Sequence, residues 1–412
     1  MLRRLGRLVT WALLGAVSGL LAGLSSWVFL EALHRVTQWR TVDATWLVWL
    51  LPVGGFVVGG AYHRFGGRAQ GGTALAVSEA HAYTAGAPAR MAPMVLVGTL
   101  LGHLVGASVG REGTAVQMSS SLTDAAARSA RLDHDHRAML ARAALAGGFG
   151  AVFGVPWAGI AFAFEVARRP TLRAFVAAVP AAFMGDAVVG WLGYHHAARP
   201  GLDLAWQWLL LPKLVVAGLV FGMAARVFAS GLPRWKARAA QWIPWPPARA
   251  ALGGAATLGL ALLLGRQYLG LSLPLVDQAF DGAAVGGWVP WLKLGFTMLA
   301  LGTGFVGGEV TPLFVVGGTL GSVLATPLGL PGVALTSLGF VAVFAGAAHL
   351  PLACAVMAGE LFGWQAVLPA LLVCWCARIV AGRTGVYEHP LSGAREPAPP
   401  SRVGHGSGRR ST

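Results

Sequence analysis

The run from Leu8 to Leu30 contains no charged residue, and it is the feature that most limits what this chain can fold into. As a helix, such a run can cross roughly 30 Å of hydrocarbon. Inside a bilayer a helix satisfies all of its own backbone hydrogen bonds, whereas an open strand does not. Similar runs recur along the 412 residues, of which 56% are hydrophobic and 11% charged, with a mean hydropathy of +0.64. The sequence therefore predicts an all-α polytopic membrane protein.

The charged residues indicate how the chain is oriented in the membrane. Three arginines precede the first run, as in a signal peptide, but the run is long and more apolar segments follow, so we interpret it as a retained helix. The net charge is +15, and the basic residues cluster in short loops and tails near residues 3–7, 64–68, 168–173, 378–383 and 395–410. This is the positive-inside pattern. We expect a multi-pass inner-membrane protein with both termini in the cytoplasm, and no nucleic-acid partner.

Two glutamates interrupt the apolar sequence within one shared pattern, V-G-x-E-x-T. It begins at Val109 and again at Val306, and it places Glu112 and Glu309 197 positions apart (309 − 112). A charge inside a membrane is costly, so an intramembrane glutamate indicates a functional site. For each glutamate the structural alternative is a carboxylate that satisfies a helix end.

Other landmarks recur at nearly the same spacing. A small-residue helix-packing pattern at Gly19 returns at Gly218, and a proline nine residues before Glu165 returns nine residues before Glu360, offsets of 199 and 195. An internal duplication predicts two membrane repeats, residues 8–212 and 213–387, between a basic start (1–7) and a disordered cytoplasmic tail (388–412). Transporter repeats are often inverted, with the site on broken helices at their interface.

The glutamate motifs suggest anion chemistry. Unpaired N–H groups and a partial positive charge make a helix N-terminus an anion site, and a helix is expected to start just after each glutamate. An ionised Glu112 would compete with the anion for the backbone amides. Since a low dielectric favours a neutral carboxyl group, protonation would release it and couple proton uptake to anion passage.

Several other residues are expected to be structural. Glu165 and Glu360 lie at helix ends, and the cysteines at 354, 374 and 376 lie in apolar segments without the spacing of a zinc site. The polar stretch 128–137, with Asp133 to His136, is expected to be a solvated loop, because no matching set of metal ligands accompanies it. The sequence therefore predicts no metal and no cofactor.

The central motifs resemble a known family. Gly110-Arg111-Glu112-Gly113 is similar to the signature of the CLC chloride channels and transporters, Gly154–Glu165 resembles their proline-containing helix pair, and Tyr387 lies where they have a pore tyrosine. The resemblance covers about residues 10–390. It implies an inverted repeat with broken and re-entrant helices, in a homodimer with one pore per subunit.

The departures from the usual CLC pattern resemble the fluoride-transporting branch. Its motifs G-R-E-G-T-x-V-Q and G-G-E-V-T-P-L-F are both present, at residues 110–117 and 307–314. Val166 stands where chloride/proton exchangers carry an inner proton-transfer glutamate, and Thr73 replaces the central serine. The resemblance implies export of fluoride in exchange for protons. Gating and proton coupling would fall to Glu112 and Glu309, and anion binding to Thr73, Gly113, Val310, Thr311 and Tyr387.

Three alternatives remain open from the residues. A chloride/proton exchanger or a passive anion channel of the same fold fits the motifs, because the physics of the site does not by itself select fluoride. An intramembrane enzyme with paired carboxylates is disfavoured, since no nucleophile or metal set joins them. A non-transporting scaffold is disfavoured by the energetic cost of two buried glutamates.

Overall fold

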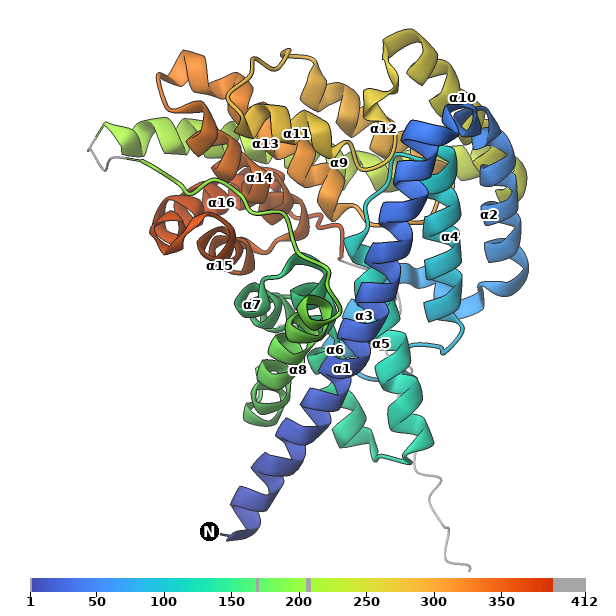
Figure 1. Cartoon of the computed structure of the whole chain (residues 1–412), viewed down its shortest axis with the longest axis vertical. Helices are drawn as coiled ribbons and strands as arrows, with labels where there is room; N and C mark the ends of the chain where they lie inside the picture. The colour runs from blue at the N-terminus through green and yellow to red at the C-terminus, as the bar shows by residue number, and fades with distance from the viewer. Residues whose placement is uncertain (1, 168–169, 205–208, 388–412) are drawn as a thin grey trace, which may run out of the picture.

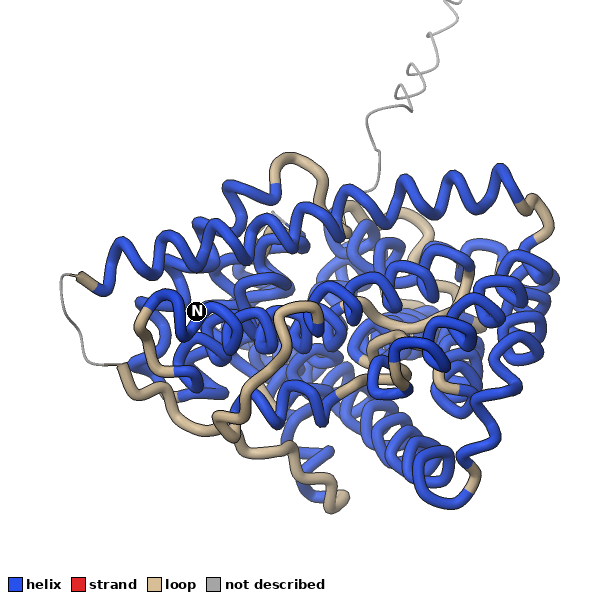
Figure 2. Tube along the Cα trace, turned by 90° about the horizontal axis from the view of Figure 1, so that it is seen from above, coloured by secondary structure: helices blue, strands red, loops and turns tan. Residues whose placement is uncertain are grey.

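The protein is built from helices, as the sequence predicts. The computed structural model describes residues 2–167, 170–204 and 209–387. This part of the chain contains sixteen α-helices and no β-strand, only one isolated β-bridge (Figures 1 and 2). The tail predicted over 388–412 lies outside the described residues.

The helices form two series of eight in the same order. The first series is α1 (Leu2–Gln38), α2 (Leu51–Phe65), α3 (Gly72–His81), α4 (Met91–Val105), α5 (Glu112–Ser129), α6 (His134–Phe153), α7 (Pro156–Ala167) and α8 (Leu172–Trp191). The second is α9 (Leu210–Trp242), α10 (Pro246–Leu264), α11 (Leu273–Phe280), α12 (Val289–Thr303), α13 (Val310–Leu328), α14 (Gly332–Ala348), α15 (Pro351–Phe362) and α16 (Val367–Ala381). Long first helices and short third helices recur in both series. The repeat boundary predicted between residues 212 and 213 falls inside the first turn of α9.

Most first-series helices, blue to green in Figure 1, lie below most of the second series, yellow to red. The two series also touch directly: α2 packs against α10 so closely that a Cβ on Gly55 would lie 2.3 Å from the Ala250 carbonyl oxygen. Seven helical segments of the described chain are long and apolar enough to cross a membrane, beginning at Arg4, Thr45, Leu172, Leu210, Pro246, Val310 and Trp364. These features agree with a polytopic membrane protein.

Small residues bring the first and last helices of each series together. A Cβ on Gly15 or Gly19 of α1 would lie 2.1 or 2.4 Å from a carbonyl oxygen of α8. In the second series, a Cβ on Gly222 of α9 would lie 2.8 Å from the Ala377 oxygen of α16. The same kind of backbone contact therefore recurs in both halves, on the two helices whose small-residue pattern predicted close packing.

The helices α7 and α15 cap each other. Glu165, near the end of α7, accepts backbone hydrogen bonds from the first turn of α15 (Leu352, 3.1 Å; Ala353, 2.7 Å). Glu360, near the end of α15, accepts them from the first turn of α7 (Trp157, 3.0 Å; Ala158, 2.7 Å). Each carboxylate thus occupies the N-terminus of the other helix, where a negative charge is favourable. The reciprocity requires the two helices to run in opposite directions, as in an inverted repeat.

One local prediction is confirmed and another is wrong. The helix pair expected around Pro156 is present as α6 and α7, with a break at Gly154, which has a φ of +72°. The prediction of a single loop over residues 128–137 is wrong, because α5 continues to Ser129 and α6 begins at His134. Asp133 caps α6 by accepting a hydrogen bond from the His136 backbone N–H at 2.8 Å. An aspartate at this position satisfies an otherwise unpaired amide, which explains the earlier helix start.

Candidate functional site

The two glutamate loops meet at the centre of the molecule. Gly110 and Gly308 form an isolated antiparallel bridge, with N···O distances of 2.6 Å from Gly110 to Gly308 and 2.9 Å in return. A Cβ on Gly110 would lie 2.8 Å from the Gly308 oxygen, and one on Gly308 would lie 2.7 Å from the Gly113 nitrogen. Because no side chain fits there, glycine at both positions lets the starts of α5 and α13 approach each other.

Glu112 is the first residue of α5, but its carboxylate lies over the start of α13. It accepts a hydrogen bond from the Thr311 backbone N–H at 3.0 Å and a second from the Thr311 hydroxyl. The Arg111 Nε also donates to it at 3.3 Å, and the glutamate is 1% exposed. A negative side chain therefore occupies the amide end of a helix, the kind of place that binds anions.

Thr73 lies beside the same glycines. It is in the first turn of α3, and a Cβ on Gly113 would lie 2.8 Å from its Oγ1 and 3.1 Å from the Gly308 Cα. Gln117 of α5 donates to the Thr73 Oγ1 at 3.1 Å. The fold thus brings the first turns of α3 and α5 together with the loop before α13.

A cavity of about 320 Å³ opens beside these residues. Its lining includes Thr73, Glu309 and Tyr387, and two cations, Lys236 of α9 and Arg249 of α10. The Tyr387 hydroxyl hydrogen-bonds the Glu309 carboxylate. Glu309 is half-buried, whereas Glu112 is fully buried. The two glutamates therefore share one centre but only Glu309 lines the cavity.

The predicted site residues are thus close together. Val310 and Thr311 form the first turn of α13 and are both buried. The amide observed on the Glu112 carboxylate is that of Thr311, one residue beyond the predicted Val310. Gly113, Thr73 and Tyr387 surround the same loops, each contributed by a different helix or loop.

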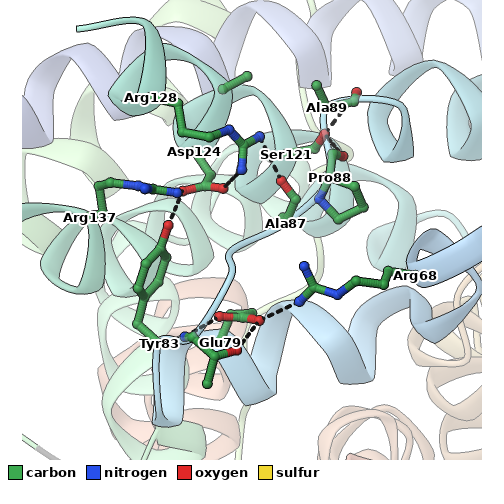
Figure 3. A network of polar contacts seen from close by, with 12 residues as sticks. Arg68, Glu79, Tyr83, Ala87, Pro88, Ala89, Ser121, Asp124, Arg128 and Arg137 are labelled. Atoms are coloured by element: carbon green, nitrogen blue, oxygen red, sulfur yellow. Dashed lines mark hydrogen bonds and ion pairs between the residues drawn. The ribbon is translucent and has the colours of Figure 1, made fainter. Parts of the chain in front are cut away.

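A polar network beside α3 supports this arrangement (Figure 3). Glu79 of α3 accepts hydrogen bonds from Arg68 (2.7 Å) and from the backbone and hydroxyl of Thr84 (2.7 and 2.8 Å). Burial alone would raise the pKa of this carboxyl group, but the hydrogen bonds from Thr84 and from the Ala85 and Gly86 backbone together outweigh it, and the pKa lies below its usual value. Further along, the Tyr83 hydroxyl donates to Asp124 of α5 at 2.6 Å. The loop after α3 is therefore tied to α5, which carries Glu112.

Comparison with known proteins decides the family. The sequence model described as voltage gated chloride channel matches residues 54–382, most of the chain. This chain belongs to the CLC family. The family consists of channels and transporters, so this CLC protein is not an enzyme.

The relatives of this CLC protein include anion channels and exchangers. The "Chloride/fluoride channel protein" of Pseudomonas syringae pv. tomato is 42% identical over 389 residues, covering 92% of this chain and 85% of the relative. The "H(+)/Cl(-) exchange transporter ClcA" of Vibrio parahaemolyticus is 28% identical and covers 90% of this chain and 86% of its own. A crystal structure of a CLC-type fluoride/proton antiporter matches with a TM-score of 0.88 at 32% identity, covering 92% of this chain and 97% of that one.

A buried lysine near the site escaped the sequence analysis. Lys293 of α12 is 0% exposed and donates to the Ser108 hydroxyl at 2.9 Å and to the Gly270 and Tyr268 carbonyl oxygens at 2.7 and 3.3 Å. Ser108 lies two residues before Gly110, so the lysine holds the loop that leads to Glu112. A charge within the apolar segment 289–303 was the available signal, and it is the same signal that identified the glutamates.

Proposed function

We propose that this CLC protein is a secondary active transporter that exports fluoride in exchange for protons, with Glu112 as its gate. The observation that carries the proposal is the Glu112 carboxylate on the amide and hydroxyl of Thr311. A carboxylate there imitates a bound anion. The 32% identity to a CLC-type fluoride/proton antiporter and the 42% identity to a chloride/fluoride channel protein support fluoride as the transported ion.

The gate works through competition between two anions. Ionised, Glu112 occupies the start of α13 and closes the path. Protonated, it loses its attraction to Thr311 and Arg111 and leaves the site, and fluoride takes its place at the backbone amides near Gly113 and Val310. Fluoride is small and strongly hydrated, so its dehydration needs strong hydrogen-bond donors such as amides and hydroxyl groups.

Glu309 serves as the second carboxylate of the coupling mechanism. It lines the cavity together with Thr73 and Tyr387, whose hydroxyl groups donate to the anion on its way to the gate. Lys236 and Arg249 line the same cavity and raise the local concentration of anions. Proton and fluoride thus pass through one region in opposite directions.

The proposed orientation follows the positive-inside pattern, with both termini in the cytoplasm of a cell whose inner membrane holds the protein as a homodimer. An inward proton gradient then drives fluoride out. The direction has a chemical reason: hydrogen fluoride enters as the neutral acid and ionises inside, which traps fluoride in the cell.

Chloride/proton exchange is the second candidate, favoured by the similarity to a chloride-exchanging relative. A passive anion channel of the same fold is the third. The test is efflux from liposomes carrying the purified protein, with fluoride and chloride compared and internal pH recorded. Fluoride efflux well above chloride, with protons entering, supports the antiporter. Equal or greater chloride flux would mean that chloride is the transported anion. Fluoride flux without proton movement would mean that the protein is a channel.

A further inference from the structure

The segment that connects the two helix series reaches back to the gate. Its described part, residues 192–204, is called here the connecting segment. Arg111 donates from Nη1 to the Tyr194 hydroxyl at 3.2 Å. Farther along, Arg199 donates to Asp277 of α11 at 2.5 Å, and the Leu202 N–H donates to the Phe362 oxygen of α15 at 2.8 Å. The connecting segment is therefore fastened to both halves of the molecule.

Between these points the connecting segment also packs against the end of α6. The His196 ring lies so close to Gly154 that a Cβ on that glycine would be 2.5 Å from its Cδ2. The Tyr194 and His196 rings meet edge to face, with centroids 5.3 Å apart. Tyr194 therefore has a fixed ring position when its hydroxyl meets Arg111.

Arg111 joins this phenol to the gate carboxylate. Its Nε donates to Glu112 at 3.3 Å while its Nη1 donates to Tyr194, and the arginine side chain is only 18% exposed. An arginine loses rotamer freedom when it is held in one geometry. A second anchor on the guanidinium keeps that geometry populated, so the cation stays beside the carboxylate.

We propose that Tyr194 is a positioning residue of the gate, whose hydroxyl holds the Arg111 guanidinium against the Glu112 carboxylate. The proposal rests on the proposed function. In the proposed orientation α1 starts in the cytoplasm, and α9 is its inverted counterpart, so the connecting segment lies on the outer side. Tyr194 thus stabilises the closed, charged gate from outside, and it keeps Arg111 in place after Glu112 takes up a proton.

The other ionisable groups around this chain of contacts are few. Glu112 faces Arg111 on its own loop and Thr311 on α13, with Glu309 and Tyr387 also within electrostatic range. His103 of α4 lies within electrostatic range of Arg111. Tyr194 has His196 and His195 in its own segment. Burial, reinforced by the charge of Arg111, lowers the pKa of His196 to about 4, so His196 is mostly neutral near pH 7.

The experiment compares Tyr194→Phe with Tyr83→Phe in the full chain. Both remove a phenol hydroxyl from an arginine–carboxylate group, but Tyr83 bonds Asp124 at the distant end of α5. Fluoride efflux from liposomes is measured over a series of symmetric pH values. In Tyr194→Phe the charged, closed gate loses support, so the pH of half-maximal efflux should rise by about 0.5 to 1 unit. Tyr83→Phe should leave the pH of half-maximal efflux unchanged.

A double-substitution cycle sharpens the result. Arg111→Lys keeps the charge but has no fork to bridge both partners. Adding Tyr194→Phe to Arg111→Lys should therefore produce no further rise. An unshifted or lowered half-maximal pH in Tyr194→Phe, or an equal rise in Tyr83→Phe, overturns the proposal. Wild-type protein that moves no fluoride overturns the proposed function instead.

Discussion

Glu112 and Glu309 occupy matching places in the two halves, but their surroundings differ. Glu112 crosses to the other half and accepts hydrogen bonds from the amide and hydroxyl of Thr311. Glu309 stays at the edge of the cavity, half-buried, with Tyr387 as its hydrogen-bond donor. One glutamate lies on a helix N-terminus, and the other faces a cavity of about 320 Å³ whose lining includes two cations.

The threonines of the two motifs differ in the same way. The Thr311 hydroxyl bonds Glu112, whereas the Thr114 hydroxyl lies 2.8 Å from that of Thr99 within the first half. The two helix starts thus share the same backbone pattern, and their side chains make one of them the proposed gate. The two halves therefore have similar backbones, but the side chains around their two glutamates make different contacts.

The largest expected effect comes from Glu112→Gln. The amide keeps the size of the side chain but neither takes up a proton nor bears a charge. Proton-coupled fluoride flux should fall by roughly 100-fold or more, the range for a group that transfers a proton directly. Proton and fluoride fluxes from liposomes measure it, with gel filtration to check folding. Proton movement like that of the wild type would remove Glu112 from the gate.

Glu309→Gln should have a smaller effect. Because this carboxylate lies at the cavity edge rather than on the helix amides, we expect proton flux to fall roughly tenfold, below the range for direct transfer, with fluoride still moving. The same liposomes report the ratio of protons to fluoride. If that ratio stays at the wild-type value, Glu309 is only a structural cap of α13, and Glu112 alone would couple protons to fluoride.

The framework of this comparison was predictable from sequence. The glutamate motifs, the repeat and the break near Pro156 are local patterns of charge, glycine and proline, and each survives in the structure. The motif residues 307–314 also indicated the branch of the family. Each motif can be recognised from neighbouring residues, and the repeat follows when the same motifs are found twice.

The contacts between the halves were not predictable. Glu112 and Thr311 are 199 residues apart, and Glu165 bonds amides 187 and 188 residues away. No local pattern encodes such pairs, because they depend on how inverted helices meet. The contact of Tyr194 with Arg111 was hidden for the same reason, since Tyr194 lies in the connecting segment, outside the repeated motifs. Lys293 was visible as a lone charge, but its acceptors were not.

Thr311→Val tests the asymmetry of the threonines. It removes the hydroxyl donor to Glu112 and keeps the backbone amide, so the closed gate should lose about 1 kcal/mol, equivalent to about a fivefold rise in fluoride leak uncoupled from protons. Thr114→Val is the matched control and should change the leak little, because its hydroxyl pairs only with Thr99 among the hydrogen bonds identified. Equal leaks from the two variants would contradict the assignment of Thr311 to the gate.

The smallest effects are expected where the halves are most alike, at the reciprocal caps. Glu165→Gln and Glu360→Gln each remove a charge from two backbone amides at a helix start, and each should lower the free energy of unfolding by about 1 kcal/mol. Glu31→Gln, which breaks an exposed pair with Arg35, is the control and should change it by less than about 0.5 kcal/mol. Denaturation of the purified protein in detergent measures all three. Equal losses of unfolding free energy in Glu165→Gln and Glu360→Gln, with transport intact, would show that the two caps contribute equally to stability. The difference between the halves would then be confined to the residues around Glu112 and Glu309. A loss of coupling in either variant would instead extend the functional site into the α7–α15 contact.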